Sequence, residues 1–298
     1  MREKKKGWII FNGNLRTPKF MEIINWLHNC ACQYGLETEL VRNNDLIVTI
    51  DNGSSKLIGK YGQSKPDFVL FWDKDITLAR HLEQMGMRLF NRAETIAICD
   101  NKALTVQCLA GKNIAMPKTI VGPLVFQELE AWEHLEVIAE ELCFPLVLKE
   151  CYGSFGQQVY LIHNYAELLN KVKELKNVPY LFQELVQSSY GQDVRLQVVG
   201  DKVVAAMLRK SDHDFRANVT NGAKMFPYEP TEEEIALAIK CSQLVGADFS
   251  AVDLLFGPQG EPLLCEVNSN GHFKNIYDCT GVDVAKAIME HILVDLGI

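Results

Sequence analysis

The sequence predicts an α/β (α+β) protein in which a parallel α/β layer comes first and antiparallel strands follow. Two observations support this prediction. Near the start of the chain, short apolar runs alternate with segments of helical apolar spacing, as in parallel strands linked by helices. Towards the end, apolar runs follow one another across glycine-containing turns, as in hairpins. The 298 residues, 48% of them hydrophobic, provide material for about two or three cores.

The parallel layer is predicted to occupy residues 1–97, as an α/β domain on the substrate side of the molecule. Apolar side chains three and four residues apart, beginning with Phe20, Ile23 and Ile24, indicate its first helix. Strands are expected where short apolar runs end at turn residues. The expected strands cover residues 7–12, 37–41, 67–72 and 88–91, and the expected helices cover residues 20–34 and 77–85.

A central lid domain is predicted over residues 98–186, with a flap of strands in front of helices. The turn Gly153-Ser154-Phe155-Gly156 stands between two strands and not before a helix, so it is neither a Walker loop nor a dinucleotide fingerprint. Its backbone amides can still clamp phosphates as a flexible lid. The expected strands cover residues 145–149, 158–162 and 180–185, and the expected helices cover residues 102–110, 132–142 and 166–175.

A C-terminal domain built on antiparallel strands is predicted over residues 187–298. Gly200-Asp201 is a common hairpin signal between two of these strands. Thr231 followed three residues later by Glu234 is a capping box, which marks the start of a helix. The expected strands cover residues 193–199, 202–209, 251–256 and 262–267, and the expected helices cover residues 231–244 and 283–294.

Composition narrows the class of partner and the compartment. The net charge of −8 argues against nonspecific binding to nucleic acid. No apolar run approaches the roughly 20 residues that span a membrane, and the run after the basic opening segment is too short for a signal peptide. Nine cysteines without a Cys-x-x-Cys pair indicate a reducing compartment and mostly buried thiols, with Cys30 and Cys32 facing a core from one helix. We expect a cytoplasmic protein with no nucleic-acid or membrane partner, and self-association into a homo-oligomer stays open.

Three oxygen-bearing side chains give the clearest chemical signal. Asp253 lies within an apolar strand, and Glu266 interrupts the next one, two residues before Asn268. On a hairpin the two carboxylates can project to one face beside the amide. Buried carboxylates are costly unless they are paired or bound to a cation, and an oxygen-only ligand set suits Mg²⁺. The alternative is that all three lie on the solvated side of a half-exposed sheet.

Other charged and polar residues suit a phosphorylated ligand. Lys149 closes an apolar strand, next to the glycine-containing turn. The strand end at residues 183–186 can offer backbone groups to an adenine edge, and Asp193 follows closely enough to reach a ribose. Arg216, in a polar loop, suits a phosphate or acyl-phosphate oxygen. Arg195 and Arg209 can add positive charge to the same region. One of the three arginines is expected to form only a surface ion pair.

Seven blocks in fixed order resemble the ATP-grasp superfamily, in the branch of ribosomal-protein-S6-type (RimK-like) glutamate ligases. The resemblance covers residues 88–298. Seven blocks in one order are far more specific than any one alone. The blocks are Asp100-Asn101-Lys102, residues 145–149 with 153–156, Gln183-Glu184, residues 191–195, residues 203–209, residues 214–218, and Asp253 with Glu266-Val267-Asn268.

The resemblance implies an ATP-grasp fold and a role for each residue that carries it. The cofactors would be ATP and magnesium, with two ions expected and manganese as a substitute. A carboxylate would become an acyl phosphate, which an amine then displaces. The implied residues are Lys102, Lys149 and Arg195 with the lid Ser154, Phe155 and Gly156 at the phosphates, Gln183, Glu184, Leu185 and Val186 at adenine, Asp193 at ribose, Asp253, Glu266 and Asn268 at the metal, and Arg216 with Asn218 as catalytic groups.

Two departures from the family pattern leave the substrates open. Relatives tend to have Ser-Pro-Gly after the metal-binding Asn, whereas this chain continues Ser269-Asn270-Gly271-His272. The lid also lacks a further glycine where Gln157-Gln158 stand. These loops shape the acceptor site, so glutamate is not established as the added amino acid, and His272 is either a substrate contact or a surface histidine. The acceptor can be a peptide, a protein or a small acid, and the alternatives are ligation of two small amino acids or a nucleotide-binding scaffold without turnover.

Overall fold

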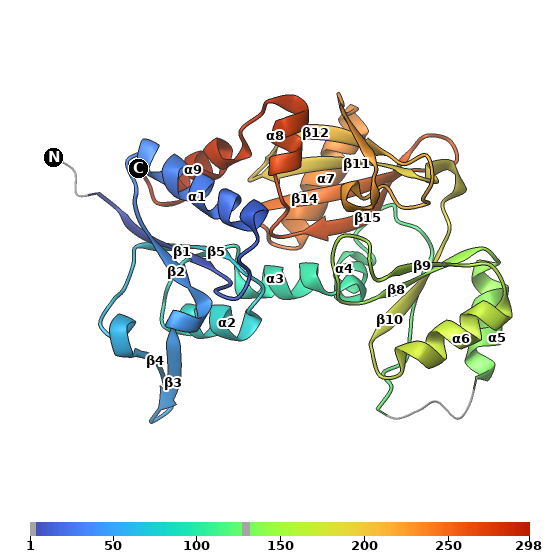
Figure 1. Ribbon diagram of the computed structural model, residues 1–298, viewed down its shortest axis with the longest axis horizontal. Coiled ribbons are helices and arrows are strands. Elements are labelled where there is room, and N and C mark those ends of the chain that lie inside the picture. Colours follow the sequence, from blue (N-terminus) through green and yellow to red (C-terminus); the bar gives the residue numbers. More distant parts are fainter. Residues whose placement is uncertain (1–3, 127–131) are drawn as a thin grey trace.

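The computed structural model describes residues 4–126 and 132–298. Three sheets follow one another along the chain, and one short hairpin is inserted within the segment that forms the first sheet (Figure 1). Residues 1–3, which belong to the basic opening segment, lie outside the described residues. Within the described ranges, no helix is both long enough and apolar enough to cross a bilayer.

The first sheet is parallel, as the alternation of strands and helices predicted. Its elements are β1 (Lys6–Phe11), α1 (Pro18–Gln33), β2 (Glu37–Arg42), β5 (Phe68–Trp72), α2 (Ile76–Gln84) and β6 (Leu89–Phe90). The strand order is β2-β1-β5-β6. All five residues of β5 are buried because α1 and α2 contribute to separate cores on its two faces. Helix α1 begins at Pro18, whose fixed φ suits the first helical turn.

A hairpin that we did not predict projects from the parallel sheet (Figure 1). Its strands are β3 (Ile47–Asp51) and β4 (Ser54–Ile58). The turn between them is Asn52-Gly53, and both residues have positive φ, at 50° and 73°. Asn-Gly is a strong signal for such a turn, so the sequence contained the information.

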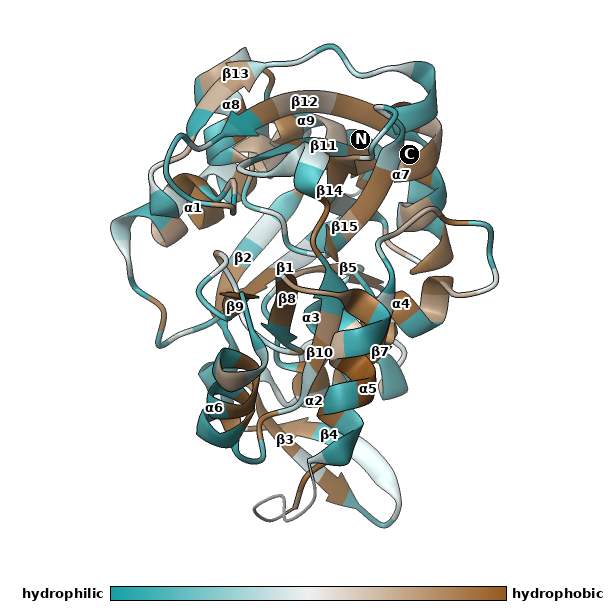
Figure 2. Ribbon diagram, turned by 90° about the vertical axis from the view of Figure 1, so that its right-hand side faces the viewer, coloured by the Kyte–Doolittle hydropathy of each residue, from teal (hydrophilic) through white to brown (hydrophobic). Residues whose placement is uncertain are grey.

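The second sheet, which we call the lid sheet, is antiparallel with the order β7-β10-β8-β9. Its strands are β7 (Thr119–Val121), β8 (Leu146–Glu150), β9 (Val159–Ile162) and β10 (Tyr180–Glu184), and its helices are α5 (Glu133–Leu142) and α6 (Tyr165–Leu175). The helices and strands enclose a core of their own. Figure 2 shows the contrast between hydrophobic strands in this region and the largely hydrophilic surface of α6. Strands β8 and β9 flank the glycine-containing turn, which confirms the predicted flap.

The third sheet is antiparallel, as predicted for the C-terminal part of the chain. Its strands are β11 (Gln192–Val199), β12 (Lys202–Lys210), β13 (Lys224–Pro227), β14 (Phe249–Phe256) and β15 (Pro262–Asn268), and its helices are α7 (Glu232–Leu244), α8 (Lys274–Thr280) and α9 (Val284–Asp295). The strand order is β13-β12-β11-β14-β15. Thr231 and Glu234 form the predicted capping box at the start of α7. Strand β13 and helix α8 are additions to the prediction.

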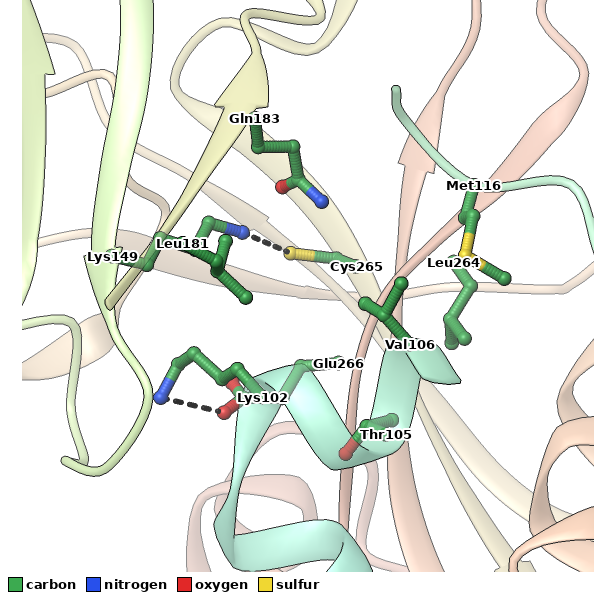
Figure 3. A pocket seen from close by; sticks show the side chains of 10 residues that line it. All are labelled: Lys102, Thr105, Val106, Met116, Lys149, Leu181, Gln183, Leu264, Cys265 and Glu266. Atoms are coloured by element: carbon green, nitrogen blue, oxygen red, sulfur yellow. Dashed lines mark hydrogen bonds and ion pairs between the residues drawn. The ribbon is translucent and has the colours of Figure 1, made fainter. Parts of the chain in front are cut away.

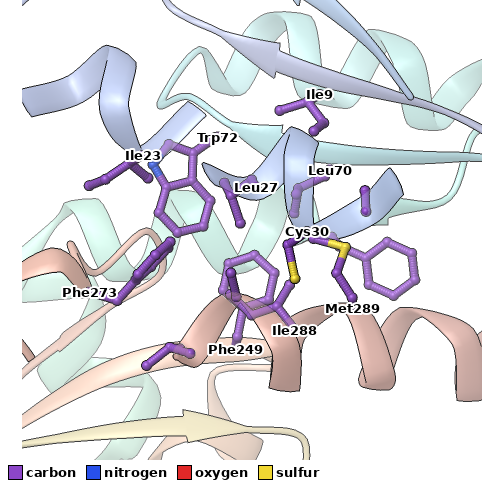
Figure 4. Close-up of a cluster of buried hydrophobic side chains, with 14 of the residues drawn as sticks. Ile9, Ile23, Leu27, Cys30, Leu70, Trp72, Phe249, Phe273, Ile288 and Met289 are labelled. Atoms are coloured by element: carbon purple, nitrogen blue, oxygen red, sulfur yellow. The ribbon is translucent and has the colours of Figure 1, made fainter. Parts of the chain in front are cut away.

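The first and third sheets share one hydrophobic core, to which α1, α8 and α9 contribute (Figure 4). Trp72 at the end of β5 stacks on Phe249 at the start of β14, with ring centroids 5.6 Å apart. Arg88 adds two hydrogen bonds to Asp248, of 3.1 and 2.6 Å. These two sheets therefore form one packed body. The lid sheet, with its separate core, is joined to this body through α3 (Ala93–Asp100), α4 (Lys102–Leu109) and the chain between β10 and β11.

The nine cysteines are all free. Cys30 is buried in the shared core, as predicted, but Cys32 is exposed. Two residues along a helix correspond to a turn of about 200°, so the two thiols cannot share one face. The prediction that both face a core was therefore wrong for Cys32.

Candidate active site

A pocket lies between the lid sheet and the third sheet, with α4 on one side (Figure 3). It brings together four residues that the sequence singled out from separate segments. Lys149 and Gln183 enter it from the lid sheet, Lys102 from α4 and Glu266 from β15. The lining residues are Lys102, Thr105, Val106, Met116, Lys149, Leu181, Gln183, Leu264, Cys265 and Glu266.

Lys149 is a buried cation, with 8% of its surface exposed. Its Nζ lies 3.9 Å from the Sγ of Cys265, and among the described residues no carboxylate lies within ion-pair distance of it. Burial raises the pKa of the Cys265 thiol to about 11, against the opposing effect of Lys149, so the thiol stays neutral near pH 7. The charge of Lys149 is thus left without a counter-ion, and a buried charge of this kind calls for an anionic ligand.

Lys102 connects the pocket to the lid turn. It stands at the first position of α4, and the side chain of Asn101 caps that helix by accepting hydrogen bonds from Ala103 N and Leu104 N. The Nζ of Lys102 lies 3.5 Å from Glu266 Oε1 and donates to Gly153 O at 3.4 Å. One lysine therefore touches both a predicted metal ligand and the start of the lid turn.

The predicted adenine segment has a mixed outcome. Gln183 is buried, lines the pocket and donates from Nε2 to Thr119 Oγ1 at 2.9 Å. Glu184 faces the neighbouring strand, where its carboxylate accepts from Lys118 N at 2.7 Å. Leu185 and Val186 are half-buried and do not belong to the lining residues. Only Gln183 of this segment is thus brought into the pocket by its side chain.

Four charged side chains form a continuous row across β12, β11 and β14. Arg195 donates two hydrogen bonds of 2.7 Å to Asp253, one to each carboxylate oxygen. Arg209 lies 3.0 Å from the same Asp253 and donates two hydrogen bonds of 2.6 Å to Asp193. Burial opposes ionisation of Asp253, but attraction to Arg195 and Arg209 outweighs it and lowers the pKa of this carboxyl. None of the row's three ion pairs was predicted from the sequence.

This row gives Asp193 a partner other than a nucleotide. Asp193 is buried, both of its carboxylate oxygens accept from Arg209, and it does not belong to the residues that line the pocket. Arg209 is itself buried, so it is not the surface arginine that the sequence led us to expect among the three. The contact of Asp193 with a ribose stays a prediction.

The predicted metal ligands occupy one corner of the third sheet. Asp253 and Glu266 lie directly opposite each other on β14 and β15, and Asn268 is opposite Ala251, two residues along. Two guanidinium groups share Oδ2 of Asp253, whereas Oδ1 accepts one hydrogen bond and keeps a lone pair. Within the described residues, no cluster of three His, Cys, Asp or Glu side chains could hold a metal alone. The donor set fits a magnesium ion, whose remaining ligands would come from substrate phosphates and water.

The lid turn is held by contacts from two directions. Lys74, two residues after β5, donates to Ser154 Oγ at 3.4 Å, and Thr220 donates to Phe155 O at 3.3 Å. Phe155 has a φ of 61° and an exposed ring. Gly156 has a φ of 71°, and a Cβ there would lie 2.2 Å from Asn218 Oδ1. Glycine is therefore required at position 156 by both conformation and close approach.

Arg216 and Asn218, the predicted catalytic residues, lie beside this lid turn. Arg216 donates to Gly156 O at 2.6 Å and to Val159 O at 3.3 Å. Its guanidinium is held by Asp214 at 2.7 Å, an ion pair that lowers the pKa of Asp214. The structure thus directs Arg216 to the lid backbone, and its contact with a transferred phosphoryl group stays a prediction.

Asn91 is a residue that sequence reasoning missed. Its fully buried amide donates to Phe249 O at 2.9 Å and to Ser269 O at 2.8 Å, and it accepts from Asp248 N at 2.7 Å. It therefore fixes the start of β14 relative to the chain that leaves β15 just after Asn268. The only signal in the sequence was a polar residue at the end of a short apolar strand.

The comparisons with known proteins agree with this geometry. A family model for the RimK-like ATP-grasp domain matches residues 99–292. Beta-citrylglutamate synthase B of Mus musculus is 34% identical over 302 residues, which cover 96% of this chain and 76% of the relative. N-acetylaspartylglutamate synthase A of Homo sapiens is 36% identical over 302 residues, which cover 96% and 75%.

A solved structure shows the same fold at low sequence identity. The D-alanine–D-alanine ligase from Bacillus anthracis, complexed with ATP, has a TM-score of 0.74 at 17% identity and covers 98% of this chain and 99% of that one. The resemblance of residues 88–298 to ATP-grasp ligases is confirmed by the family match. Because that match spans most of the chain and both relatives cover nearly all of it, this chain belongs to the RimK-like ATP-grasp family of ligases.

Proposed function

We propose that this chain is an ATP-dependent carboxylate–amine ligase that forms an amide bond through an acyl phosphate. One observation carries the proposal: Lys149, which has no carboxylate partner in the part of the chain that the structure describes, shares a pocket with Lys102 and Glu266, and Asp253 lies directly opposite Glu266. The phosphates of a nucleoside triphosphate supply negative charge for the two lysines, and a divalent cation supplies positive charge for the two carboxylates. The nine free thiols support a cytoplasmic location as part of this proposal.

In the proposed reaction, a carboxylate oxygen of the first substrate attacks the γ phosphorus of ATP. The bond to the bridging oxygen breaks, ADP leaves and an acyl phosphate forms. The amine nitrogen then attacks the acyl carbon, phosphate leaves, and the nitrogen releases a proton to solvent. No covalent bond to the enzyme is needed, so its contribution is positioning and electrostatic stabilisation.

Each residue has a defined task in this scheme. Lys102 and Lys149 bind the α and β phosphates, and Gln183 contacts the adenine. Asp253, Glu266 and Asn268 would hold two magnesium ions, for which manganese can substitute. When bound, these ions supply positive charge that screens the β and γ phosphates during transfer.

The substrates that the proposal favours are acids. The two relatives are named for beta-citrylglutamate and N-acetylaspartylglutamate, each of which joins glutamate to another acid. We infer that this chain also couples an acidic amino acid to a carboxylic acid, which is either a small molecule or the end of a peptide.

The test is an assay of nucleotide and product together. The purified chain is incubated with ATP, magnesium and a panel of carboxylate and amine pairs, and the products are identified by mass spectrometry. We expect ADP, phosphate and an amide in equal amounts. AMP and pyrophosphate would contradict an acyl phosphate. Tight ATP binding without turnover on any pair would instead indicate a nucleotide-binding scaffold.

A further inference from the structure

Three parts of the molecule meet at the loop that follows Asn268. The amide of Asn270 donates to Asp73 O, at the end of β5, over 2.9 Å. The ring of His272 faces the lid residue Phe155, with centroids 6.0 Å apart. The loop therefore touches both the first sheet and the lid turn, and it continues directly from a predicted metal ligand.

Two exposed lysines reach the same place from the first sheet and α1. Lys19 Nζ donates to Asn275 Oδ1 at 2.9 Å, three residues after His272, and among the described residues no carboxylate lies within ion-pair distance of it. Lys74 adjoins Asp73, pairs with Asp100 and reaches Ser154 Oγ at 3.4 Å. Neither lysine lines the pocket that holds Lys149. Lys19 donates to a neutral amide, whereas Lys74 would share its charge between Asp100 and a second ligand.

The pKa of His272 reflects the positive charges near this loop. Burial, together with the positive charges of Lys19, Arg195 and Lys74, lowers the pKa of His272 to about 4. The ring is therefore neutral near pH 7 and has one N–H to donate. Its Nδ1 is buried and has no hydrogen-bond partner among the described residues. A neutral donor surrounded by cations suits an anionic group and repels an ammonium group.

We propose that Lys19, Lys74 and His272 form a subsite for a carboxylate group of the non-nucleotide substrates, distinct from the carboxylate that is phosphorylated. Phe155 covers this subsite when the lid is closed. The inference deepens the proposed function, because it assigns residues to the selection of acidic substrates. The acid is held by two ammonium groups from the packed body and one imidazole from the loop after β15.

The experiment compares substrates with their isosteric amides. Binding of glutamate against glutamine, and of aspartate against asparagine, is measured by calorimetry in the presence of magnesium and ADP. The wild-type chain should bind the acid of at least one pair on the order of tenfold more tightly than the amide. Lys19→Gln and Lys74→Gln should each reduce that preference severalfold. His272→Asn, which retains a donor, should keep more of it than His272→Phe.

Two controls separate this inference from loss of folding and from the proposed function. Lys286→Gln removes another exposed lysine, on α9, and should leave the preference unchanged. The binding of ATP should stay within twofold in the Lys19 variant, since Lys19 neither lines the pocket that holds Lys149 nor contacts the lid turn. Lys74 and His272 contact the lid residues Ser154 and Phe155, so their variants are compared with the wild-type chain at saturating ADP. A wild-type chain with no preference for any acid, or a preference unchanged in both lysine variants, would overturn the subsite. Acid binding that depends on Lys19 in a chain without turnover would instead support the subsite and reject the ligase.

Discussion

Arg195 and Asp253 lie directly opposite each other on β11 and β14, and each carboxylate oxygen of Asp253 accepts a hydrogen bond of 2.7 Å from Arg195. The carboxylate is therefore fixed before any metal binds. Only Oδ1 keeps a free lone pair, so in the proposed metal site Asp253 would offer one oxygen, in a direction set by the arginines. Such a preformed ligand would need little rearrangement to bind the proposed cation.

Removal of the negative charge from either predicted metal ligand should lower turnover by a larger factor than it lowers nucleotide affinity. Glu266→Gln and Asp253→Asn are expected to lower turnover on the order of a hundredfold or more, because positive charge at the transferred group is lost. ADP release at increasing magnesium measures this effect. Normal rates in both variants would place the metal elsewhere.

Arg209 should matter for folding and not only for chemistry. Arg209→Met leaves the buried carboxylate of Asp193 without a partner, which is expected to lower the free energy of unfolding by about 3–5 kcal/mol. Denaturant unfolding checks this value. Arg80→Met is the matched control, because Arg80 forms an exposed pair with Glu94 at 3.1 Å and should cost less than about 1 kcal/mol. Equal losses in the two variants would contradict the buried row.

Arg216 and Lys149 should have opposite kinetic signatures. Arg216→Ala is expected to keep ATP affinity within about tenfold and to lose on the order of a hundredfold in turnover, since in the proposed mechanism it acts on charge that develops during transfer, and it also donates to Gly156 O. Lys149→Ala should mainly weaken ATP binding. Steady-state kinetics with a separate measurement of ATP affinity resolves the two. An Arg216→Ala enzyme that no longer binds ATP but retains its rate at saturation would reverse the assignment.

Asn91 should act as a positioning residue for the metal corner. Asn91→Ala leaves the carbonyl groups of Phe249 and Ser269 without their donor, and each buried unpaired group costs about 1–3 kcal/mol. We also expect a higher magnesium concentration for half-maximal activity, because the chain after Asn268 is no longer fixed. Asn91→Ser, which keeps a shorter donor, should have a stability and a magnesium requirement between those of the wild-type chain and Asn91→Ala. A loss of stability with an unchanged magnesium requirement would show that Asn91 is structural alone.

The neutral state of His272 predicts a pH dependence of stability. Its pKa is lowered from 6.5 to about 4 in the folded chain by burial and by Lys19, Arg195 and Lys74. Between these values the unfolded chain binds the additional proton, so the free energy of unfolding falls as the pH falls from 6.5 to 4, by at most about 3 kcal/mol. His272→Asn should show a shallower slope over this interval. An identical slope in the variant would mean that other groups cause it.

The sequence predicted those parts of the site that depend on local pattern. Asp253 and Glu266 stand in adjacent apolar strands around a short turn, so a hairpin brings them together, as the register confirms. Lys149 ends an apolar strand and does enter the pocket. The alternation of strands and helices, and then of strands alone, was sufficient to predict a parallel sheet followed by antiparallel ones.

Features that depend on register between distant strands could not be predicted. The pairing of Asp193 with Arg209 requires knowledge of which residues of β11 and β12 face each other, around a bulge at Gln197. The hydrogen bonds of Asn91 join residues about 160–180 positions apart, beyond any periodic pattern. The three-part division at residues 97 and 186, and the roles of the site residues, stay predictions.

The separate core of the lid sheet has a consequence for coupling. An acyl phosphate is lost if water hydrolyses it before the amine attacks. Polar contacts from Arg216, Lys74 and Thr220 hold the lid turn in place, so we expect the opening of these contacts to admit water. Leakage, the ATP consumed per amide formed, therefore measures how often those contacts open during one catalytic cycle. The same ratio would show how often the acyl phosphate is lost before the amine substrate binds.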